Sequence, residues 1–218
     1  MPGRSARRAV RTAVVAGACA LGSAGGLSGQ DADLEGVGHD LGDPEAPVLV
    51  VEYADFACDA CAQFAVDTWP RVREAFVETG RVRWKVVPFE LGFRNSEEGA
   101  RAGECGAAQG RFWELHDALY EHRAEWVDER NPKDELVELA AGTGLDAEVF
   151  RRCYDDEPFR DRTKAANRAA REAGVRGTPT FFVNGFQVQG ALPFEAFRTV
   201  LEDAAATPDP GRSPPERE

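Results

Sequence analysis

The sequence predicts an α/β protein in which a mixed central sheet is interrupted by an all-helical insertion. Strand patterns occupy two parts of the chain, at about 48–87 and 180–189, and the block between them is almost wholly helical. In the first part a helical pattern separates two strands, and such a crossover implies that the strands run parallel. In the second part Asn184-Gly185 is a type I′ turn signal, which predicts an antiparallel hairpin. Both kinds of pairing therefore meet in one sheet.

The elements of the first part follow from hydrophobic patterning and from proline. Val48-Leu49-Val50-Val51 is an apolar, largely β-branched run and predicts a buried strand that continues to about Ala54. A helical pattern runs from Asp59 to about Thr79, and Pro70 within it should kink or break the helix. Residues 82–87 alternate between apolar and polar side chains and predict the second strand.

The remaining elements are mostly helices. In the insertion, helices are predicted from Asn95 or Ser96 and over about 112–120, 133–142, 146–154 and 158–173. Strands follow at 180–183 and 186–189, and Pro193 opens a last helix that ends near Ala205. The predicted organisation is a signal segment (1–29), a linker (30–46), the sheet domain (47–94 and 174–205), a helical insertion (95–173) and a disordered tail (206–218).

Composition excludes some classes of function. The 218 residues carry a formal net charge of -12, and 43% of them are hydrophobic. Binding to nucleic acid needs clustered basic groups, so a nucleic-acid partner is not expected. The acidic balance also disfavours docking of the folded domain on an anionic membrane.

The first thirty residues predict export. A basic start with Arg7 and Arg8 is followed by an uncharged, apolar stretch, which is typical of a secretory signal. Cys19 follows Val15-Ala16-Gly17-Ala18, a faint likeness to a lipoprotein cleavage box. We favour loss of Cys19 with the signal over lipid anchoring. An extracytoplasmic location, such as the periplasm, permits disulfides to form and persist.

The strongest chemical signal is Cys58-Asp59-Ala60-Cys61, which follows a strand and opens a helix. The unpaired N–H groups and the dipole of a helix N-terminus favour a thiolate on the first cysteine. A thiolate attacks a disulfide, and a second cysteine then resolves the mixed disulfide. We therefore interpret Cys58 as the nucleophile and Cys61 as the resolving thiol. Half of a structural zinc site is the alternative, but no second pair of ligands has a fitting spacing.

Several motifs together resemble the DsbA-like thioredoxin family. They are Val51-Glu52-Tyr53-Ala54-Asp55-Phe56-Ala57-Cys58 with Cys61, Phe112-Trp113-Glu114-Leu115-His116-Asp117, and the segment Gly177–Gly185. The resemblance covers about residues 38–204 in order. It implies a thioredoxin fold with a helical insertion and dithiol–disulfide exchange with exported proteins, without a cofactor or a metal.

The resemblance also assigns roles to further residues. It implies that the Thr178–Pro179 bond is cis and faces the cysteine pair, with the Thr178 backbone free to pair with substrate. Glu52 stands where the family has a buried acid, which would accept the proton of Cys61. The alternative for Glu52 is a solvent-exposed carboxylate at a strand end. Some members carry a structural disulfide in the insertion, which here would join Cys105 and Cys153; two buried free thiols are the alternative.

One departure from the family concerns the residues between the two cysteines. The family often has Pro with His or Tyr, whereas this chain has Asp59-Ala60. A carboxylate beside Cys58 disfavours its thiolate through like-charge repulsion. Since a less stable thiolate means a less oxidising disulfide, we expect a weaker oxidant than the strongest members.

The function predicted from the sequence is that of an exported thiol–disulfide oxidoreductase. The Cys58–Cys61 disulfide would oxidise thiols of unfolded or partly folded exported proteins, and a membrane redox partner would regenerate it. A reductase or isomerase of the same fold is one alternative, because the redox potential sets the direction. A redox-inactive binding or chaperone module is an alternative of another class, which the intact Cys58, Cys61 and Pro179 disfavour.

Overall fold

The centre of the protein is a five-stranded sheet with the strand order β1-β3-β2-β4-β5. The computed structural model describes residues 34 and 36–207, so the expected signal segment, Cys19 and the tail from residue 208 lie outside it. The strands are β1 (His39–Leu41), β2 (Val48–Ala54), β3 (Val82–Pro88), β4 (Thr180–Val183) and β5 (Phe186–Gln189). β2 and β3 pair in parallel, and the other pairs are antiparallel. The predicted mixed sheet is confirmed.

Two local predictions are also confirmed, the hairpin turn at Asn184-Gly185 and the break in the helix near Pro70. Asn184 and Gly185 have φ values of 46° and 84°, as a type I′ turn between β4 and β5 requires. The predicted long helix is broken near Pro70 into α1 (Asp59–Asp67), α2 (Trp69–Val72) and the π-helix η2 (Arg73–Val77). Pro70 lies in the first turn of α2, where a missing N–H leaves no hydrogen bond unmade.

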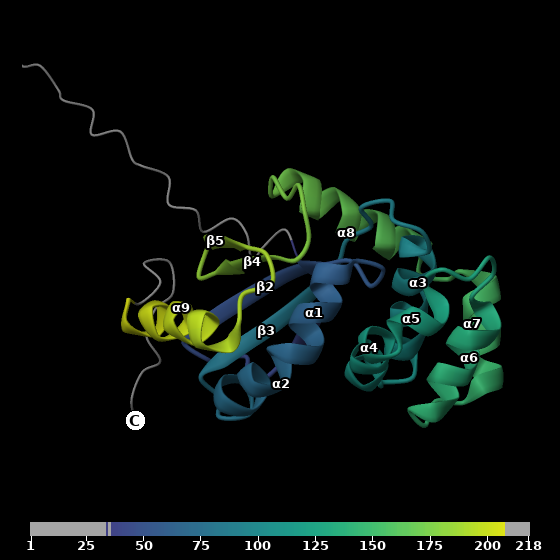
Figure 1. Cartoon of the computed structure of the whole chain (residues 1–218), viewed down its shortest axis with the longest axis horizontal. Coiled ribbons are helices and arrows are strands. Elements are labelled where there is room, and N and C mark those ends of the chain that lie inside the picture. The colour runs from purple at the N-terminus through teal and green to yellow at the C-terminus, as the bar shows by residue number, and fades with distance from the viewer. Residues whose placement is uncertain (1–33, 35, 208–218) are drawn as a thin grey trace, which may run out of the picture.

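Helices cover both faces of the sheet (Figure 1). Alternate residues of β2 point to opposite faces, as in any strand. Val48, Val50 and Ala54 belong to the larger core, which includes Phe64 of α1 and Phe197 of α9 (Phe194–Ala206). On the other face, Val51 and Tyr53 pack with Ala166 and Ala170 of α8 (Arg160–Glu172). The side of the sheet that carries α1 is therefore also the side of the cysteine pair.

The position of α8 differs from the sequence prediction, which placed 158–173 within the insertion. Ala166 and Ala170 are buried against the sheet, so α8 completes the second helical layer. Small alanine side chains let a helix approach a sheet closely, but they give a weak apolar stripe in a sequence pattern. The pattern predicted a helix without showing what it packs on.

The rest of the insertion lies at one end of the sheet, to the right in Figure 1. Its helices are α3 (Ser96–Ala108), α4 (Phe112–Glu121), α5 (Arg123–Trp126), α6 (Lys133–Gly142) and α7 (Ala147–Asp156). Phe56, just after β2, fits against α3, because a Cβ built on Gly99 would lie 2.7 Å from the Phe56 Cβ. Gly99 thus permits a close approach between the insertion and the loop before Cys58.

The predicted linker over 30–46 is wrong in part, because β1 lies within it. β1 pairs antiparallel with the edge of β3. The His39 ring stacks on Phe112 at 3.7 Å between centroids, and its Nε2 lies 3.1 Å from an Oε1 of the buried Glu104. The Trp113 Nε1 donates to the Asp40 carbonyl at 3.0 Å. Contacts with the insertion, and ion pairs of Asp40 with Arg83 and Lys85 of β3, therefore stabilise this short strand, which shows no apolar alternation.

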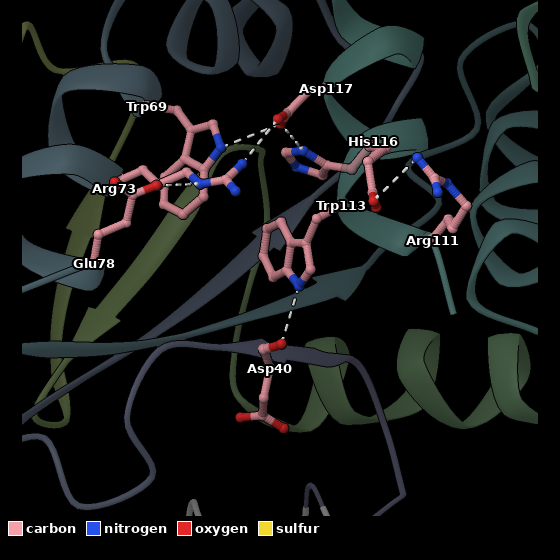
Figure 2. A network of polar contacts seen from close by, with 9 residues as sticks. Asp40, Trp69, Arg73, Glu78, Arg111, Trp113, His116 and Asp117 are labelled. Atoms are coloured by element: carbon pink, nitrogen blue, oxygen red, sulfur yellow. Dashed lines mark hydrogen bonds and ion pairs between the residues drawn. The ribbon is translucent and has the colours of Figure 1, made fainter. Parts of the chain in front are cut away.

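A polar network joins the crossover helices to α4 (Figure 2). The carboxylate of Asp117 accepts hydrogen bonds from Trp69 Nε1 at 3.2 Å and from Arg73 at 3.3 Å. The same carboxylate lies 2.8 Å from Nδ1 of His116, whose side chain is buried among aromatic rings. The network holds α4 against α2 and η2, and so fixes the insertion beside the cysteine-bearing helix.

Candidate active site

The two cysteines lie at the junction between strand β2 and helix α1. Cys58 is the N-cap of α1, and its backbone N–H donates to the Asp55 carbonyl at 3.0 Å in the turn after β2. Cys61 lies in the first turn of α1, and the two thiols are free and buried. Helix N–H groups without a backbone partner are therefore directed at Cys58, as the sequence pattern predicts.

The segment before β4 lies against the first cysteine. The Thr178–Pro179 peptide bond is cis. The Sγ of Cys58 lies 3.5 Å from the carbonyl oxygen of Thr178, although the two residues are 120 positions apart. The structure thus brings Cys58, Cys61, Thr178 and Pro179 together.

The two thiols differ in acidity. The hydrogen bond from the Cys61 thiol is the largest influence on Cys58, and with backbone N–H groups of Cys61 and Ala60 it lowers the pKa of Cys58 to about 6 against the opposing effect of burial. Burial raises the pKa of Cys61 above its usual value, and its interaction with Cys58 raises it further. The first cysteine is therefore suited to be a thiolate nucleophile and leaving group, and the second to remain a thiol until it reacts.

Glu52 is a buried acid and not a solvent-exposed strand-end carboxylate. Its side chain is on the same face of β2 as Val50 and Ala54, and 3% of the residue is exposed. Burial raises the pKa of Glu52 to about 8, against the lowering effect of a 3.0 Å hydrogen bond from Trp84 Nε1. Val50 and Ala54, which flank Glu52 on this face of β2, belong to the same core as Cys61. The acid and the second thiol are therefore both buried on the α1 side of the sheet.

Asp55 is a structural residue of this site that the motif contained but sequence reasoning did not single out. Its carboxylate accepts hydrogen bonds from the backbone N–H of Ala57 at 2.9 Å and of Leu91 at 2.8 Å, and from the Ser96 hydroxyl at 2.7 Å. These bonds join the turn before Cys58 to the loop after β3 and to the first residue of α3. Burial raises the pKa of Asp55, and the same hydrogen bonds oppose that rise.

Arg123 is a second residue that sequence reasoning missed. It is the first residue of α5, and its Nε and one terminal nitrogen donate to the carbonyl oxygen of Ala57 at 2.9 Å and 2.5 Å. The other terminal nitrogen lies 2.6 Å from a carboxylate oxygen of Asp59. The carboxylate beside Cys58 is therefore paired, which the reasoning from the Asp59-Ala60 dipeptide did not include. No local signal marks Arg123, because 66 positions separate it from Ala57.

The other cysteine pair lies apart from this site. Cys105 of α3 and Cys153 of α7 form a disulfide, with their Cα atoms 5.8 Å apart. It ties together two helices of the insertion. Within residues 34 and 36–207 no group of three or more His, Cys, Asp or Glu side chains is arranged to hold a metal.

No helix in the described part of the chain is both long and apolar enough to cross a membrane.

Comparison with known sequences gives two kinds of relative. Residues 35–203 match the family model described as Thioredoxin. The chain is 39% identical over 185 residues to a protein of Salinispora tropica named Na(+)/H(+) antiporter NhaA 3, covering 82% of this chain but only 27% of that protein. The chain thus spans about a quarter of the length of the first of its curated relatives. It is also 30% identical over 149 residues to the probable disulfide bond formation protein D of Bacillus cereus, which covers 66% of this chain and 69% of the relative.

The solved structures point to the same family. The oxidised BdbD of Bacillus subtilis superposes with a TM-score of 0.70 at 25% identity, covering 79% of this chain and 95% of that one. The likeness to Wolbachia pipientis α-DsbA1, at 23% identity and a TM-score of 0.68, concerns the fold. With the sheet order, the cysteine pair at the start of α1 and the helical insertion, these matches show that the chain belongs to the DsbA-like family of thioredoxin-fold proteins.

Proposed function

We propose that the protein is an exported thiol–disulfide oxidoreductase that uses the Cys58–Cys61 disulfide to oxidise cysteines of unfolded or partly folded exported proteins. The observation that carries the proposal is the placement of the two cysteines: Cys58 caps α1 with its Sγ 3.5 Å from the Thr178 carbonyl, and Cys61 is buried in the first turn of the same helix. Hydrogen bonds at this place lower the pKa of Cys58 to about 6, and burial raises the pKa of Cys61. A stable Cys58 thiolate favours the reduced form of the pair, so the disulfide accepts electrons readily.

The chemistry proceeds in two exchanges. A substrate thiolate attacks Sγ of Cys58, which forms a mixed disulfide and breaks the Cys58–Cys61 bond, and the sulfur of Cys61 takes up a proton. A second substrate thiolate then attacks the substrate sulfur of the mixed disulfide. This step releases Cys58 as a thiolate and leaves the substrate oxidised by two electrons. The low pKa of Cys58 makes it a good leaving group in this second step.

Glu52 supplies or accepts the proton of Cys61. With a pKa of about 8, its carboxyl is mostly protonated at neutral pH, so it donates a proton when the Cys61 sulfur is released. In the reverse direction, when Cys61 attacks a mixed disulfide, the Glu52 carboxylate accepts the Cys61 proton. Regeneration of the disulfide requires an electron acceptor, and we assign this role to a membrane redox partner.

The decisive measurement is the equilibrium of the reduced and oxidised protein with glutathione, together with oxidation of a reduced, unfolded substrate protein. We expect Cys58→Ser to abolish exchange. In Cys61→Ser the Cys58 thiolate should attack oxidised glutathione, release one reduced glutathione and accumulate as a mixed disulfide with the other half, because no resolving thiol remains. A potential close to that of a strong reductant would favour the reductase alternative. Absence of any exchange would instead favour a binding or chaperone role. Export is tested separately, by fractionating cells that express the full chain.

A further inference from the structure

The pairing of Asp59 with a residue of the insertion changes what the cysteine dipeptide does. A carboxylate next to Cys58 repels the thiolate, and the side chain of Asp59 is 92% exposed, with no cover of its own. The side chain of Arg123 is only 20% exposed and comes from α5, outside the sheet domain. The contact therefore places a largely buried cation beside an exposed acid at the edge of the active site.

The geometry of Arg123 is specific. The guanidinium contacts the residues on both sides of Cys58. It donates to the carbonyl oxygen of Ala57, which precedes Cys58, and it pairs with the carboxylate of Asp59, which follows it. Two nitrogens share the Ala57 oxygen and the third takes Asp59, so each guanidinium nitrogen has a partner on this loop. Such a fork fixes the direction of the positive charge, as a lysine ammonium does not.

We propose that Arg123 is a positioning residue that offsets the charge of Asp59 and thereby keeps the Cys58 thiolate stable. This inference rests on the proposed exchange at Cys58, and it names the residue that keeps the thiolate of that exchange stable. An insertion helix would then set the oxidising power of the pair, and the dipeptide alone would not.

Other charged or titratable groups also surround the thiolate, and the test has to leave them in place. Cys61 on α1 hydrogen-bonds to Cys58, Asp55 lies in the turn that precedes it, and the charge of Cys58 acts on the phenol of Tyr120 on α4. Glu52 faces the same core from β2. Arg123 also lowers the pKa of Asp55, so the comparison of Arg123→Gln with the double variant, neither of which has Arg123, isolates the charge of Asp59.

The test compares the pH titration of the Cys58 thiolate in the wild type, Arg123→Gln, Asp59→Asn and the double variant, followed by thiolate absorbance. Coulomb interaction near an exposed surface amounts to about half a unit to one unit of pKa. We expect Arg123→Gln to raise the Cys58 pKa by that amount, Asp59→Asn to lower it, and the double variant to return close to the wild type. At pH 7 the glutathione equilibrium of Arg123→Gln should become about three- to fivefold less oxidising, or about 15–20 mV.

A variant and a control separate charge from a purely structural role. Arg123→Lys retains the charge without the fork, so its titration should stay closer to the wild type than to Arg123→Gln. Arg198→Gln removes an arginine that pairs with Glu195 and Glu202 on α9, at the other end of the molecule in Figure 1, and should leave the Cys58 titration unchanged. High salt should shrink the Arg123→Gln shift.

The outcomes are distinguishable. If Arg123→Lys behaves as Arg123→Gln does, or if Asp59→Asn leaves the titration unchanged, the charge-offset proposal is wrong while the exchange chemistry stands. An ordinary thiol pKa for Cys58 in the wild type, with no exchange with glutathione, would instead overturn the proposed function. Asp59→Asn changes an exposed side chain, so it tests the proposal even if variants of Arg123 fail to fold.

Discussion

Replacing Glu52 by glutamine should stabilise the protein increasingly as the pH rises. Burial favours the neutral carboxyl and raises its pKa from 4.5 to about 8, while the unfolded chain keeps an ordinary value. Between these two values the folded state holds a proton that the unfolded state has lost, so stability falls as the pH rises. By pH 7 this costs the folded state about 3 kcal/mol, at about 1.4 kcal/mol per pH unit above 4.5. Glutamine carries no charge and keeps an oxygen for the Trp84 N–H.

The assay is denaturant unfolding of the wild type and Glu52→Gln from pH 5 to pH 9, both with the Cys58–Cys61 disulfide formed so that neither thiol titrates. The difference in unfolding free energy should grow with pH up to about 8 and then level off. Glu138→Gln, a change at an exposed position on α6, is the matched control and should move stability by less than about 0.5 kcal/mol. A difference that is flat across this range would refute the burial of a proton on Glu52.

Two further perturbations test the packing of the insertion. Replacing Cys105 and Cys153 together by serine should lower the unfolding free energy by about 4 kcal/mol, because the bridge closes a loop of 48 residues. Cys58 should still titrate as in the wild type. A loss of unfolding free energy below about 1 kcal/mol would contradict this prediction. Gly99→Ala should cost about 1–3 kcal/mol, since its Cβ would lie 2.7 Å from the Cβ of Phe56. Gly142→Ala, whose Cβ meets nothing within 4 Å, is the control and should not destabilise; equal thermal shifts for the two variants would rule out the steric reasoning.

The parts of the fold that patterning predicted are those determined by neighbours in the chain. The hairpin at Asn184-Gly185 needs two residues with positive φ, and the break near Pro70 needs a missing donor, so both follow from local chemistry. The placement of Cys58 at a helix start has the same origin. β1 has only three residues, and it is stabilised by pairing with β3 and by contacts of His39 and Asp40 with residues far away in the chain. A pattern within three residues cannot report such contacts.

The candidate site divides in the same way. Cys58 and Cys61 are visible as a spaced pair, and the resemblance supplied Pro179 and Glu52. Arg123 was invisible because an arginine at a short helix start is usually a solvated residue, and only the folded chain brings it to Asp59. The sequence therefore suggested an unpaired acid beside Cys58, whereas the structure shows Asp59 paired with Arg123.

Burial of Glu52 lowers the stability of the folded protein at neutral pH, and the same burial gives Glu52 the pKa that the proposed proton transfer needs. Cys61 is a buried thiol of raised pKa, and in the proposed mechanism Glu52, which faces the same core, exchanges its proton. A carboxyl with an ordinary pKa would be ionised at neutral pH and would have no proton for the released Cys61 sulfur. With a pKa of about 8, Glu52 has both forms available within a unit of neutrality. Glu52→Gln should therefore gain stability and lose speed in mixed-disulfide resolution, and a variant that gained stability at unchanged rate would show that this proton moves by another path.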